Sequence, residues 1–519
     1  MNLESNNSTG LLGHPKGLMT LFFSEMWERS CYYGMRVLLT LYLVKSLMKG
    51  DAEASLIYGA YTGLVYAAPI LGGNMADKFL GYRYAVLFGA ILMVIGEFII
   101  IGGTEPMLLM GMGALIIGNG YFKANISTIV GKLYADGDPK RDSGFTIFYI
   151  GINIGALIAT TLIAWVGETH GFKWGFALAG FGMLLGFFIF LSGKKQFHLL
   201  PGVQIPEAGK KKVFAGLNMV QLISIGSLFL IPACYVLIQH NSVMMWLLLG
   251  LLAIVSYTLL IAGRKEDKRM ELANETDMLA EKTGDKSKSI WFDRMIAFFI
   301  LFLVNVVFWA CFEQAGTSLT LFADRNVDRM IFDWEMPASM TQFFNPFFII
   351  VFGSIFSAMW VKLSKMGKNP SIPVKFGLAF FQIALGFLVV KFMLPFANEE
   401  FQVPLITLIL LYLLHTTGEL FISPIGLSMV TKLAPKKVAG MAMGAWFLSW
   451  AMANYLGGII ASMSGGGHGE SGEVIKLTTQ EGLKQYTEIF SILAYVLLGI
   501  GFLVILLNKP IQKLMHGVE

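Results

Sequence analysis

Residues 263–289, GRKEDKRMELANETDMLAEKTGDKSKS, form the longest charged run in a chain that is otherwise mostly apolar. Of the 519 residues, 55% are hydrophobic and 14% are charged, and the mean hydropathy is +0.65. These values exclude a soluble protein. They are typical of a polytopic membrane protein, in which small and aromatic residues pack helices against each other and against lipid. The charged run therefore divides one membrane protein into two parts.

On both sides of this run the sequence separates into apolar segments, and a bilayer needs roughly 20 such residues for each spanning helix. We expect an all-α polytopic membrane protein with fourteen transmembrane helices. They lie near residues 19–46, 54–76, 84–103, 107–134, 144–167, 172–193, 214–239, 243–263, 290–323, 337–363, 371–396, 402–432, 438–463 and 486–508. The first segment is too long for a cleavable signal, so we interpret it as a retained helix.

Lysine and arginine are distributed unevenly among these segments. With both termini in the cytoplasm, the inner loops and helix ends hold 28 of the 39 basic residues, and the outer segments hold 8. Loops rich in these residues remain on the cytoplasmic side. We therefore expect an integral plasma membrane protein, of the bacterial inner membrane, with both termini cytoplasmic. The remaining three basic residues, Arg29, Arg36 and Lys123, fall inside membrane segments.

A short internal repeat relates the two parts of the chain. IVGKLY (129–134) followed by PKRDSG (139–144) recurs as MVTKLA (429–434) followed by PKKVAG (435–440). Six helices repeated in the same sense are the arrangement of major facilitator transporters, with substrate held between the halves near the bilayer midplane. We expect a tail 1–18, a six-helix bundle 19–193, a cytoplasmic linker 194–213, an extra helix pair 214–263, a charged cytoplasmic linker 264–289, a second six-helix bundle 290–508 and a tail 509–519.

The first segment carries several charges, although a charge at the bilayer centre costs about 2.5–3.5 kcal/mol on insertion scales. On a helical wheel of about 100° per residue, its polar side chains fall within one arc of about 140°. They are Glu25, Glu28, Arg29, Tyr32, Tyr33 and Arg36. This face indicates a cavity rather than lipid. Two interpretations stay open for Glu25, proton coupling or ion pairs that only lock helices together, whereas cations beside tyrosines suit a carboxylate ligand.

Three later segments each place two polar or aromatic groups one helical turn apart, and so on one face. The pairs are Asn119 with Lys123, Trp309 with Glu313, and His415 with Glu419. A cation in the first half and acids in the second half predict an electrically bipolar cavity. Burial favours the protonated form of a carboxyl group, which is the chemistry that a proton-coupled carrier needs.

Other classes of protein are disfavoured by the motifs that the sequence lacks. It contains no Walker, HExxH or GxSxG motif, and Cys31, Cys234 and Cys311 have no zinc or redox spacing. We therefore expect no enzyme, no metal, no cofactor and no nucleic-acid partner. For Glu97 we favour a structural or interfacial role. Trp446 is either part of a packing stripe or part of the wall of a pocket.

The motif Glu-x-x-Glu-Arg-x-x-Tyr-Tyr at residues 25–33 resembles the signature of the proton-coupled oligopeptide transporter (POT) family of the major facilitator superfamily. The resemblance extends over nearly the whole chain. Later motifs of the family are similar to GGNMADKFLGYR (72–83), FYIGINIGALI (148–158), FWACFEQ (308–314) and GELFISPIGLSMVTKLAP (418–435). The extra helix pair before the linker resembles prokaryotic members.

The resemblance implies a proton-driven symporter that imports di- and tripeptides by alternating access. It implies that the peptide carboxylate end meets Arg29, Tyr33 and Lys123, with Glu25 and Glu28 coupling to Lys123. It implies that Asn153, Asn345 and Glu419 hold the amino terminus, and that Tyr66 and Trp309 line the pocket. It also implies that Glu313, paired with Arg36 or Lys123, takes part in proton coupling and gating.

Two departures from the family pattern are visible. Ser30 replaces the usual aromatic residue after Glu-Arg, a change that we expect to be tolerated. Gly59 stands where animal members carry a second-helix histidine, so proton coupling would rest on the carboxylates.

Two alternatives remain. A carrier of nitrate or of another small anion or metabolite is one, although Arg29 and Lys123 together with Glu419 favour a ligand with two separated charges. A receptor that binds peptide without translocation is the other; a long signalling tail would favour it, and the residues after Asn508 offer none.

Overall fold

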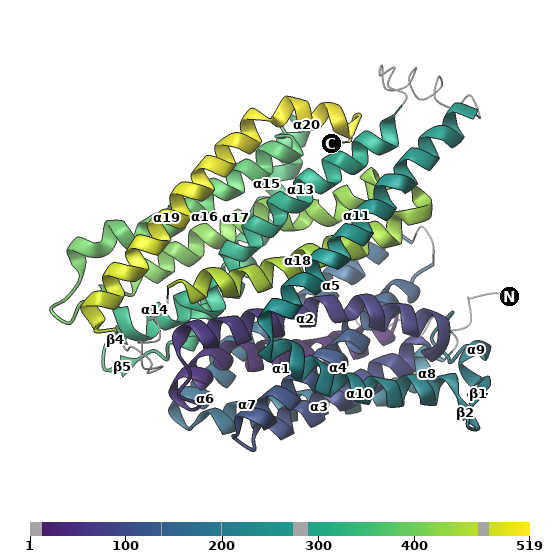
Figure 1. Cartoon of the computed structure of the whole chain (residues 1–519), viewed down its shortest axis with the longest axis horizontal. Coiled ribbons are helices and arrows are strands. Elements are labelled where there is room, and N and C mark those ends of the chain that lie inside the picture. Colours follow the sequence, from purple (N-terminus) through teal and green to yellow (C-terminus); the bar gives the residue numbers. More distant parts are fainter. Residues whose placement is uncertain (1–12, 136–137, 199, 273–288, 465–476, 519) are drawn as a thin grey trace. The chain divides into compact units, whose positions relative to one another are not determined.

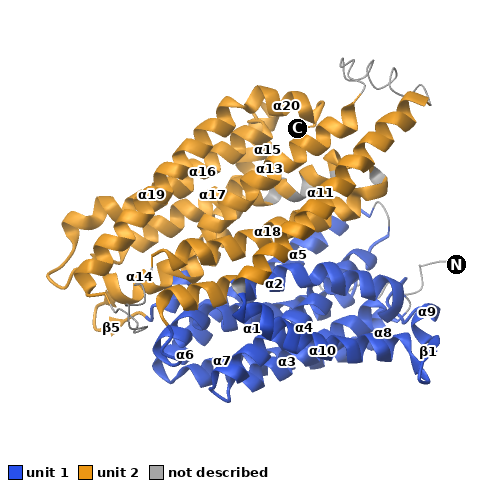
Figure 2. Ribbon diagram, viewed as in Figure 1, with its two compact units in different colours: residues 1–49, 60–241, 337–343 blue, residues 50–59, 242–336, 344–519 orange. Residues whose placement is uncertain are grey.

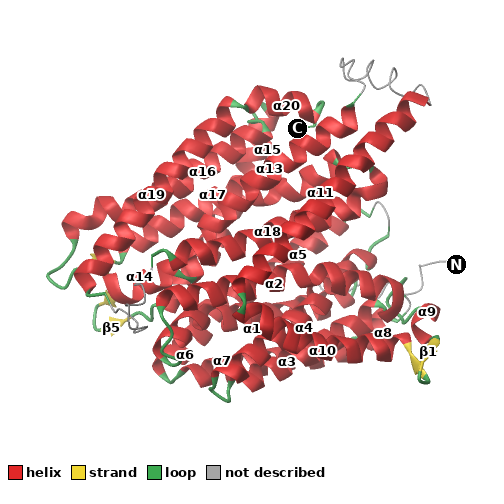
Figure 3. Ribbon diagram, viewed as in Figure 1, coloured by secondary structure: helices red, strands yellow, loops and turns green. Residues whose placement is uncertain are grey.

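The computed structural model describes residues 13–135, 138–198, 200–272, 289–464 and 477–518. Helices make up nearly all of this part of the chain (Figures 1 and 3). Up to the charged run they are α1 (Gly17–Lys45), α2 (Asp51–Met75), η3 (Ala76–Leu80), α3 (Tyr82–Ile100), α4 (Glu105–Lys132), α5 (Arg141–Ile158), η4 (Ala159–Ile163), α6 (Ala164–Thr169), α7 (Phe172–Ser192), α8 (Lys194–Phe197), α9 (Glu207–Lys210), α10 (Met219–Gln239) and α11 (Asn241–Leu272).

The part of the chain after the charged run is also mostly helical. They are α13 (Ile290–Phe312), η5 (Glu313–Gly316), α14 (Ser318–Asn326), η6 (Ser339–Phe343), α15 (Phe344–Lys365), α16 (Ile372–Met393), η7 (Leu394–Phe396), α17 (Ile406–Leu433), η8 (Lys436–Val438), α18 (Ala439–Ser462), α19 (Thr479–Leu506) and α20 (Asn508–Met515).

Twelve helical runs in the described part of the chain are long and apolar enough to cross a membrane. Two further helices, α1 with 29 residues and α18 with 24, are also long enough at 1.5 Å per residue. Charged side chains lower the hydropathy of α1, and Gly, Trp and Asn lower that of α18. Each of the fourteen expected segments coincides with one of these helices or runs, so the predicted all-α fold class is confirmed.

The chain divides into two compact units, which Figure 2 colours separately. Unit 1 contains Met1–Lys49, Ala60–Asn241 and Pro337–Phe343; unit 2 contains Gly50–Gly59, Ser242–Met336 and Phe344–Glu519. The extra helix pair is therefore split, because α10 belongs to unit 1 and α11, from Ser242 onward, belongs to unit 2. Helix α2 is also split, at Gly59.

In unit 1, glycines allow α3 and α4 to pack backbone against backbone. A Cβ atom added to Gly89 would lie 2.4 Å from the carbonyl oxygen of Gly118, and one added to Gly96 would lie 2.7 Å from that of Gly111. Gly89 and Gly96 are seven residues apart on α3, and Gly111 and Gly118 are seven residues apart on α4. Seven residues are about two helical turns, so the glycines of each helix lie on one face. Small residues at such stripes are what let membrane helices associate closely.

Hydrogen bonds between hydroxyl groups join α10 to α3 and α4 within unit 1. Tyr84 and Ser224 lie 3.0 Å apart, and Tyr121 and Ser227 lie 2.7 Å apart. Val220 of α10 also joins a buried apolar cluster with Tyr121. This half of the extra pair is therefore packed along α3 and α4.

In unit 2 the start of α2 is held by an ion pair. Arg325 near the end of α14 donates to both carboxylate oxygens of Asp51, at 2.5 and 2.8 Å. Asp51 is 8% exposed, and buried bidentate pairs of this kind fix geometry as well as charge. This contact accounts for the inclusion of Gly50–Gly59 in unit 2.

Three pairs of short strands accompany the helices in the described residues (Figure 3). In unit 1, β1 (Lys212–Phe214) pairs antiparallel with β2 (Leu217–Asn218). In unit 2, β3 (Val327–Asp328) pairs parallel with β6 (Val403–Pro404), and β4 (Met330–Ile331) pairs antiparallel with β5 (Trp334–Glu335).

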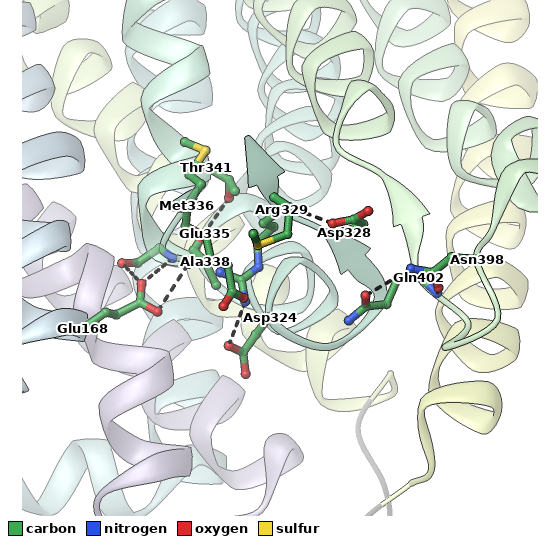
Figure 4. Close-up of polar contacts among 12 residues, drawn as sticks. Glu168, Asp324, Asp328, Arg329, Glu335, Met336, Ala338, Thr341, Asn398 and Gln402 are labelled. Carbon is green, nitrogen blue, oxygen red and sulfur yellow. Dashed lines mark hydrogen bonds and ion pairs between the residues drawn. The ribbon is translucent and has the colours of Figure 1, made fainter. Parts of the chain in front are cut away.

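Side chains stabilise the connection that contains β3 to β5, as Figure 4 shows. Within unit 2, Arg329 donates to the backbone oxygen of Met336 and, at 2.7 Å, to Oε1 of Glu335. Within unit 1, Glu168 at the end of α6 accepts hydrogen bonds from the backbone N–H groups of Ala338 at 3.2 Å and Ser339 at 2.7 Å. Glu168 thus satisfies backbone donors where the helical run η6–α15 begins.

The charged run does not end α11 where the sequence analysis expected. The helix continues to Leu272, beyond the expected end at residue 263, because its charged side chains find partners. Asp267 accepts hydrogen bonds from the backbone N–H groups of Trp291 and Phe292, at 2.8 and 3.0 Å, in the first turn of α13. Most of the expected linker, residues 273–288, lies outside the described residues.

Candidate functional site

The polar side chains of α1 form a buried ion-pair cluster inside unit 1. Arg29 donates to both oxygens of Glu28, with Nη2 2.6 Å from Oε1, and its Nε lies 3.4 Å from Oε1 of Glu25. All three residues are at most 1% exposed. Charges so far from water require partners. The single polar face expected from the helical wheel is therefore the face on which these groups meet.

Helix α4 contributes to the same cluster through a residue to which the sequence analysis gave no role. Asn119 Nδ2 donates to Oε1 of Glu28 at 2.7 Å. Its own Oδ1 is buried without a hydrogen-bond partner among the described residues. The sequence analysis placed Asn119 on one helix face with Lys123 but could not predict that it bonds to Glu28, which is 91 residues away in the chain.

The cations of unit 1 lie against tyrosine rings. Lys123 Nζ is 4.6 Å from the ring centroid of Tyr66, and the guanidinium carbons of Arg29 and Arg36 are each 5.9 Å from that of Tyr33. Such distances are those of cation–π contacts. Two expected pocket tyrosines therefore contact the expected cations, and Glu28 forms its hydrogen bonds with Arg29 and Asn119.

Asn153 lies on α5, which packs directly against the polar part of α1. A Cβ atom added to Gly155 would lie 2.3 Å from the backbone oxygen of Met26 and 2.8 Å from Cβ of Arg29. Asn153 is 8% exposed, and its Nδ2 donates to the backbone oxygen of Tyr149 at 2.9 Å. The close approach of α5 brings Asn153 to the same region of unit 1 as the α1 cluster.

In unit 2 the structure joins two of the residues expected to act together. Asn345 of α15 donates from Nδ2 to Oε2 of Glu419 at 2.9 Å, and the same nitrogen lies 3.1 Å from Oγ1 of Thr416, one turn earlier on α17. Asn345 and Glu419 are half-buried. Thr416 was not identified from the sequence, because a threonine in an apolar helix carries no distinctive pattern.

Trp309 and Glu313 lie where α13 ends. Glu313 opens the 3-10 turn η5 and is 5% exposed. The Trp309 ring makes edge contacts with Phe312 and Trp450, at centroid distances of 5.0 and 5.7 Å. Its Nε1 is buried without a hydrogen-bond partner in the described part of the chain.

Trp446 and His415 both pack in the interior of unit 2. Trp446 is 1% exposed, lies 6.0 Å from the Phe298 ring and covers Gly426. His415 is 2% exposed and meets the Phe387 ring edge-on at 4.7 Å. No group of three metal-ligating side chains occurs among the described residues.

Glu97 of α3 has a partner on α1. Cys31 Sγ donates to Glu97 Oε1 at 3.3 Å, and both residues are fully buried. Glu97 Oε2 is buried without a partner among the described residues. This hydrogen bond joins α1 to α3.

Comparison with known proteins gives these clusters a family. The chain matches the POT family over residues 83–476. The chain belongs to the POT family. It is 33% identical to the peptide transporter YePEPT of Yersinia enterocolitica subsp. palearctica, covering 100% of this chain and 99% of that protein. It is 30% identical to the dipeptide and tripeptide permease B of Xenorhabdus bovienii, covering 89% and 90%.

The fold agrees with that of a solved member of the POT family. A crystal structure of a peptide transporter POT in complex with sulfate matches with a TM-score of 0.80 and 30% sequence identity over 100% of both chains. The predicted family is therefore confirmed, and this POT-family chain is a membrane transporter rather than an enzyme.

Proposed function

We propose that this chain is a proton-coupled symporter that imports dipeptides and tripeptides by alternating access. One observation carries the proposal: buried cations with tyrosines gather in unit 1, and a carboxylate held by an amide, Glu419 with Asn345, lies in unit 2. A peptide has a carboxylate at one end and an ammonium group at the other, so it needs both. The names of the relatives, peptide transporter and dipeptide and tripeptide permease, support the same substrate class.

For the peptide carboxylate we propose Arg29, Tyr33 and Lys123. A guanidinium and an ammonium give charge-assisted hydrogen bonds to a carboxylate. Tyrosine rings lie beside both cations, and Arg29, which pairs with Glu28 and Glu25 in this structure, would exchange a carboxylate partner to bind the peptide.

For the peptide amino terminus we propose Glu419, Asn345 and Asn153. Tyr66 and Trp309 would line the pocket, and Trp309 would also offer an N–H donor. Trp446 packs in the core, so it would act by supporting the residues that line the pocket.

For proton coupling we propose the acidic groups and the cations that face them, with the proton as coupling ion and no other cofactor. The acids in this proposal are Glu25, Glu28 and Glu313, and the cations are Arg36 and Lys123. A carboxylate that exchanges a proton must change its partners during transport, and Glu25 has an oxygen free of hydrogen bonds among the described residues. The proposed location is the bacterial inner membrane with both termini in the cytoplasm, following the distribution of basic residues.

The test is uptake of a labelled dipeptide into proteoliposomes with and without an inward proton gradient. Accumulation that requires the gradient is the expected result. Binding of the dipeptide without uptake would replace the symporter with a receptor. Competition by nitrate but not by unlabelled peptides would replace it with an anion carrier.

A further inference from the structure

The segment before α10 carries a basic hairpin, which we define as residues 210–218. It consists of Lys210 and Lys211, the strand β1, a tight turn and the strand β2. Residues 210–216 are all exposed, including two large apolar side chains: Val213 is 59% exposed and Phe214 is 70% exposed. Figure 1 shows the hairpin beside α9 at the end of unit 1.

The segment that precedes the hairpin is held to α3 and η3 by backbone contacts. Backbone N–H groups of Tyr82 and Arg83 at the start of α3 donate to the carbonyl oxygens of Gly202 and Val203, both at 3.2 Å. Val203 is 1% exposed. A Cβ atom added to Gly209 would lie 1.9 Å from the backbone oxygen of Phe79, so the chain passes η3 in direct backbone contact just before the hairpin. The orientation of the hairpin is therefore set by the body of unit 1.

The hairpin also stands where a spanning helix begins. Asn218 caps α10 reciprocally with Gln221: each side chain accepts a hydrogen bond from the backbone N–H group of the other at 2.9 Å. The Met219 N–H group donates to the Lys211 carbonyl oxygen at 3.2 Å. Since α10 is one of the twelve helical runs that are apolar enough to span a membrane, the hairpin lies at a membrane surface.

The linker that contains the hairpin is predominantly basic. Lys194 and Lys195, exposed in α8 directly after α7, belong to the same linker as the three lysines of the hairpin, Lys210, Lys211 and Lys212. Against these five lysines, residues 194–218 contain one acid, Glu207, which pairs with Lys210 at 2.7 Å in an exposed position. Lysines that only direct topology need no apolar side chains beside them, so the exposed Val213 and Phe214 require another explanation.

We propose that the basic hairpin binds anionic phospholipid headgroups of the inner leaflet, with its lysines on the phosphates and Val213 and Phe214 inserted at the headgroup boundary. Basic residues next to a membrane helix attract anionic lipids, and aromatic side chains favour the interface. The proposal rests on the proposed cytoplasmic orientation of the linker, but it requires no transport activity.

The test places a reporter at the hairpin tip of the full-length protein. Phe214→Cys introduces a thiol that reacts selectively, because Cys31, Cys234 and Cys311 are buried. The protein is reconstituted in nanodiscs of phosphatidylcholine alone or with phosphatidylglycerol, and the labelling rate by a water-soluble maleimide is measured. Since each lysine near an anionic surface contributes roughly a fivefold change in affinity, three lysines correspond to about 100-fold. Labelling should therefore be slower with phosphatidylglycerol by up to about 100-fold, and high salt should abolish the difference.

The matched control uses another exposed lysine triplet. In the Phe214→Cys background, Lys210, Lys211 and Lys212 changed to Gln should remove the lipid dependence, whereas the same change at Lys362, Lys365 and Lys368, exposed at the end of α15, should retain it.

Equal labelling in both lipids, or lipid dependence that survives the hairpin substitutions, would overturn the proposal. Protection by soluble phosphate in phosphatidylcholine discs would also overturn it, since the site would then bind free anions. Failure of peptide uptake would leave these labelling results unchanged, so the two proposals are tested separately.

Discussion

Glu25 and Glu28 face the same guanidinium group but differ in how many hydrogen bonds they accept. Both oxygens of Glu28 accept bonds, from Arg29 and Asn119, whereas Glu25 Oε2 accepts none among the described residues. Glu25→Gln is therefore expected to abolish gradient-driven uptake but to leave peptide counterflow, which needs no net proton movement, at least partly intact. Glu28→Gln should reduce both activities, because it also loosens Arg29 and Asn119. Equal loss of both activities in Glu25→Gln would assign Glu25 a structural role.

Lys123 of α4 lies 4.6 Å from the Tyr66 ring centroid and is one of the cations proposed to bind the peptide carboxylate. We expect Lys123→Ala to weaken a free dipeptide by roughly 10- to 150-fold, the equivalent of a charge-assisted hydrogen bond of about 1.5–3 kcal/mol. The C-terminal amide of the same dipeptide lacks the carboxylate and should lose much less. The measurement is competition of each ligand against a labelled peptide. Similar losses for both ligands would mean that Lys123 does not bind the carboxylate.

Glu419 is the carboxylate to which Asn345 donates in unit 2. Glu419→Gln is close in shape and still accepts a hydrogen bond, so insertion should be unaffected while dipeptide binding falls sharply. N-acetylated dipeptides have no ammonium group; they should bind wild type poorly and lose little more in the variant. The check is competition binding at matched expression. If N-acetylation does not affect binding to wild type, an ammonium site at Glu419 is ruled out.

At the level of elements, the α3–α4 contact depends on glycines that a methyl group would push apart. Gly89→Ala would place Cβ 2.4 Å from a backbone oxygen, which cannot move aside as a side chain can. Overpacking of this kind costs about 1–3 kcal/mol, so the melting temperature in detergent should fall. Gly499→Ala in α19 is the control, since no atom lies within 4 Å of its added Cβ. Alanine favours a helix over glycine by about 1 kcal/mol, so the control should be at least as stable as wild type. A control that is destabilised as much as Gly89→Ala would contradict a packing cause.

Element boundaries also show where local patterns are insufficient. The apolar part of α11 ends near residue 263, yet the helix continues to Leu272. Its continuation is stabilised by Asp267, which accepts a hydrogen bond from the backbone N–H group of Trp291, 24 residues later, in the first turn of α13. A hydropathy pattern reports the length of chain that crosses the bilayer, and a helix in water beyond it is decided by such contacts.

At the level of the whole molecule, the charged run 263–289 is expected to be dispensable as a covalent link. Each part of the chain carries its own spanning helices, and a cut after residue 280 leaves Asp267 and the backbone N–H groups of Trp291 and Phe292 able to pair between the two fragments. Residues 1–280 and 281–519 produced as separate polypeptides should restore gradient-driven peptide uptake when coexpressed, and neither should do so alone. Uptake in cells that produce both fragments is compared with uptake in cells that produce the intact chain. Absence of uptake despite stable insertion of both fragments would contradict this domain organisation.

The sequence by itself determined the all-α fold class, the positions of the spanning helices and the polar face of α1. Each of these is local: a bilayer needs one continuous apolar segment, and a helix repeats its faces every 3.6 residues. The tertiary structure alone decided the partners. Asn119 reaches Glu28 across 91 residues, Asn345 reaches Glu419 across 74, and the extra helix pair is divided between the two units. These pairings depend on which helices pack side by side, and glycine contacts and buried hydrogen bonds between distant segments set that packing.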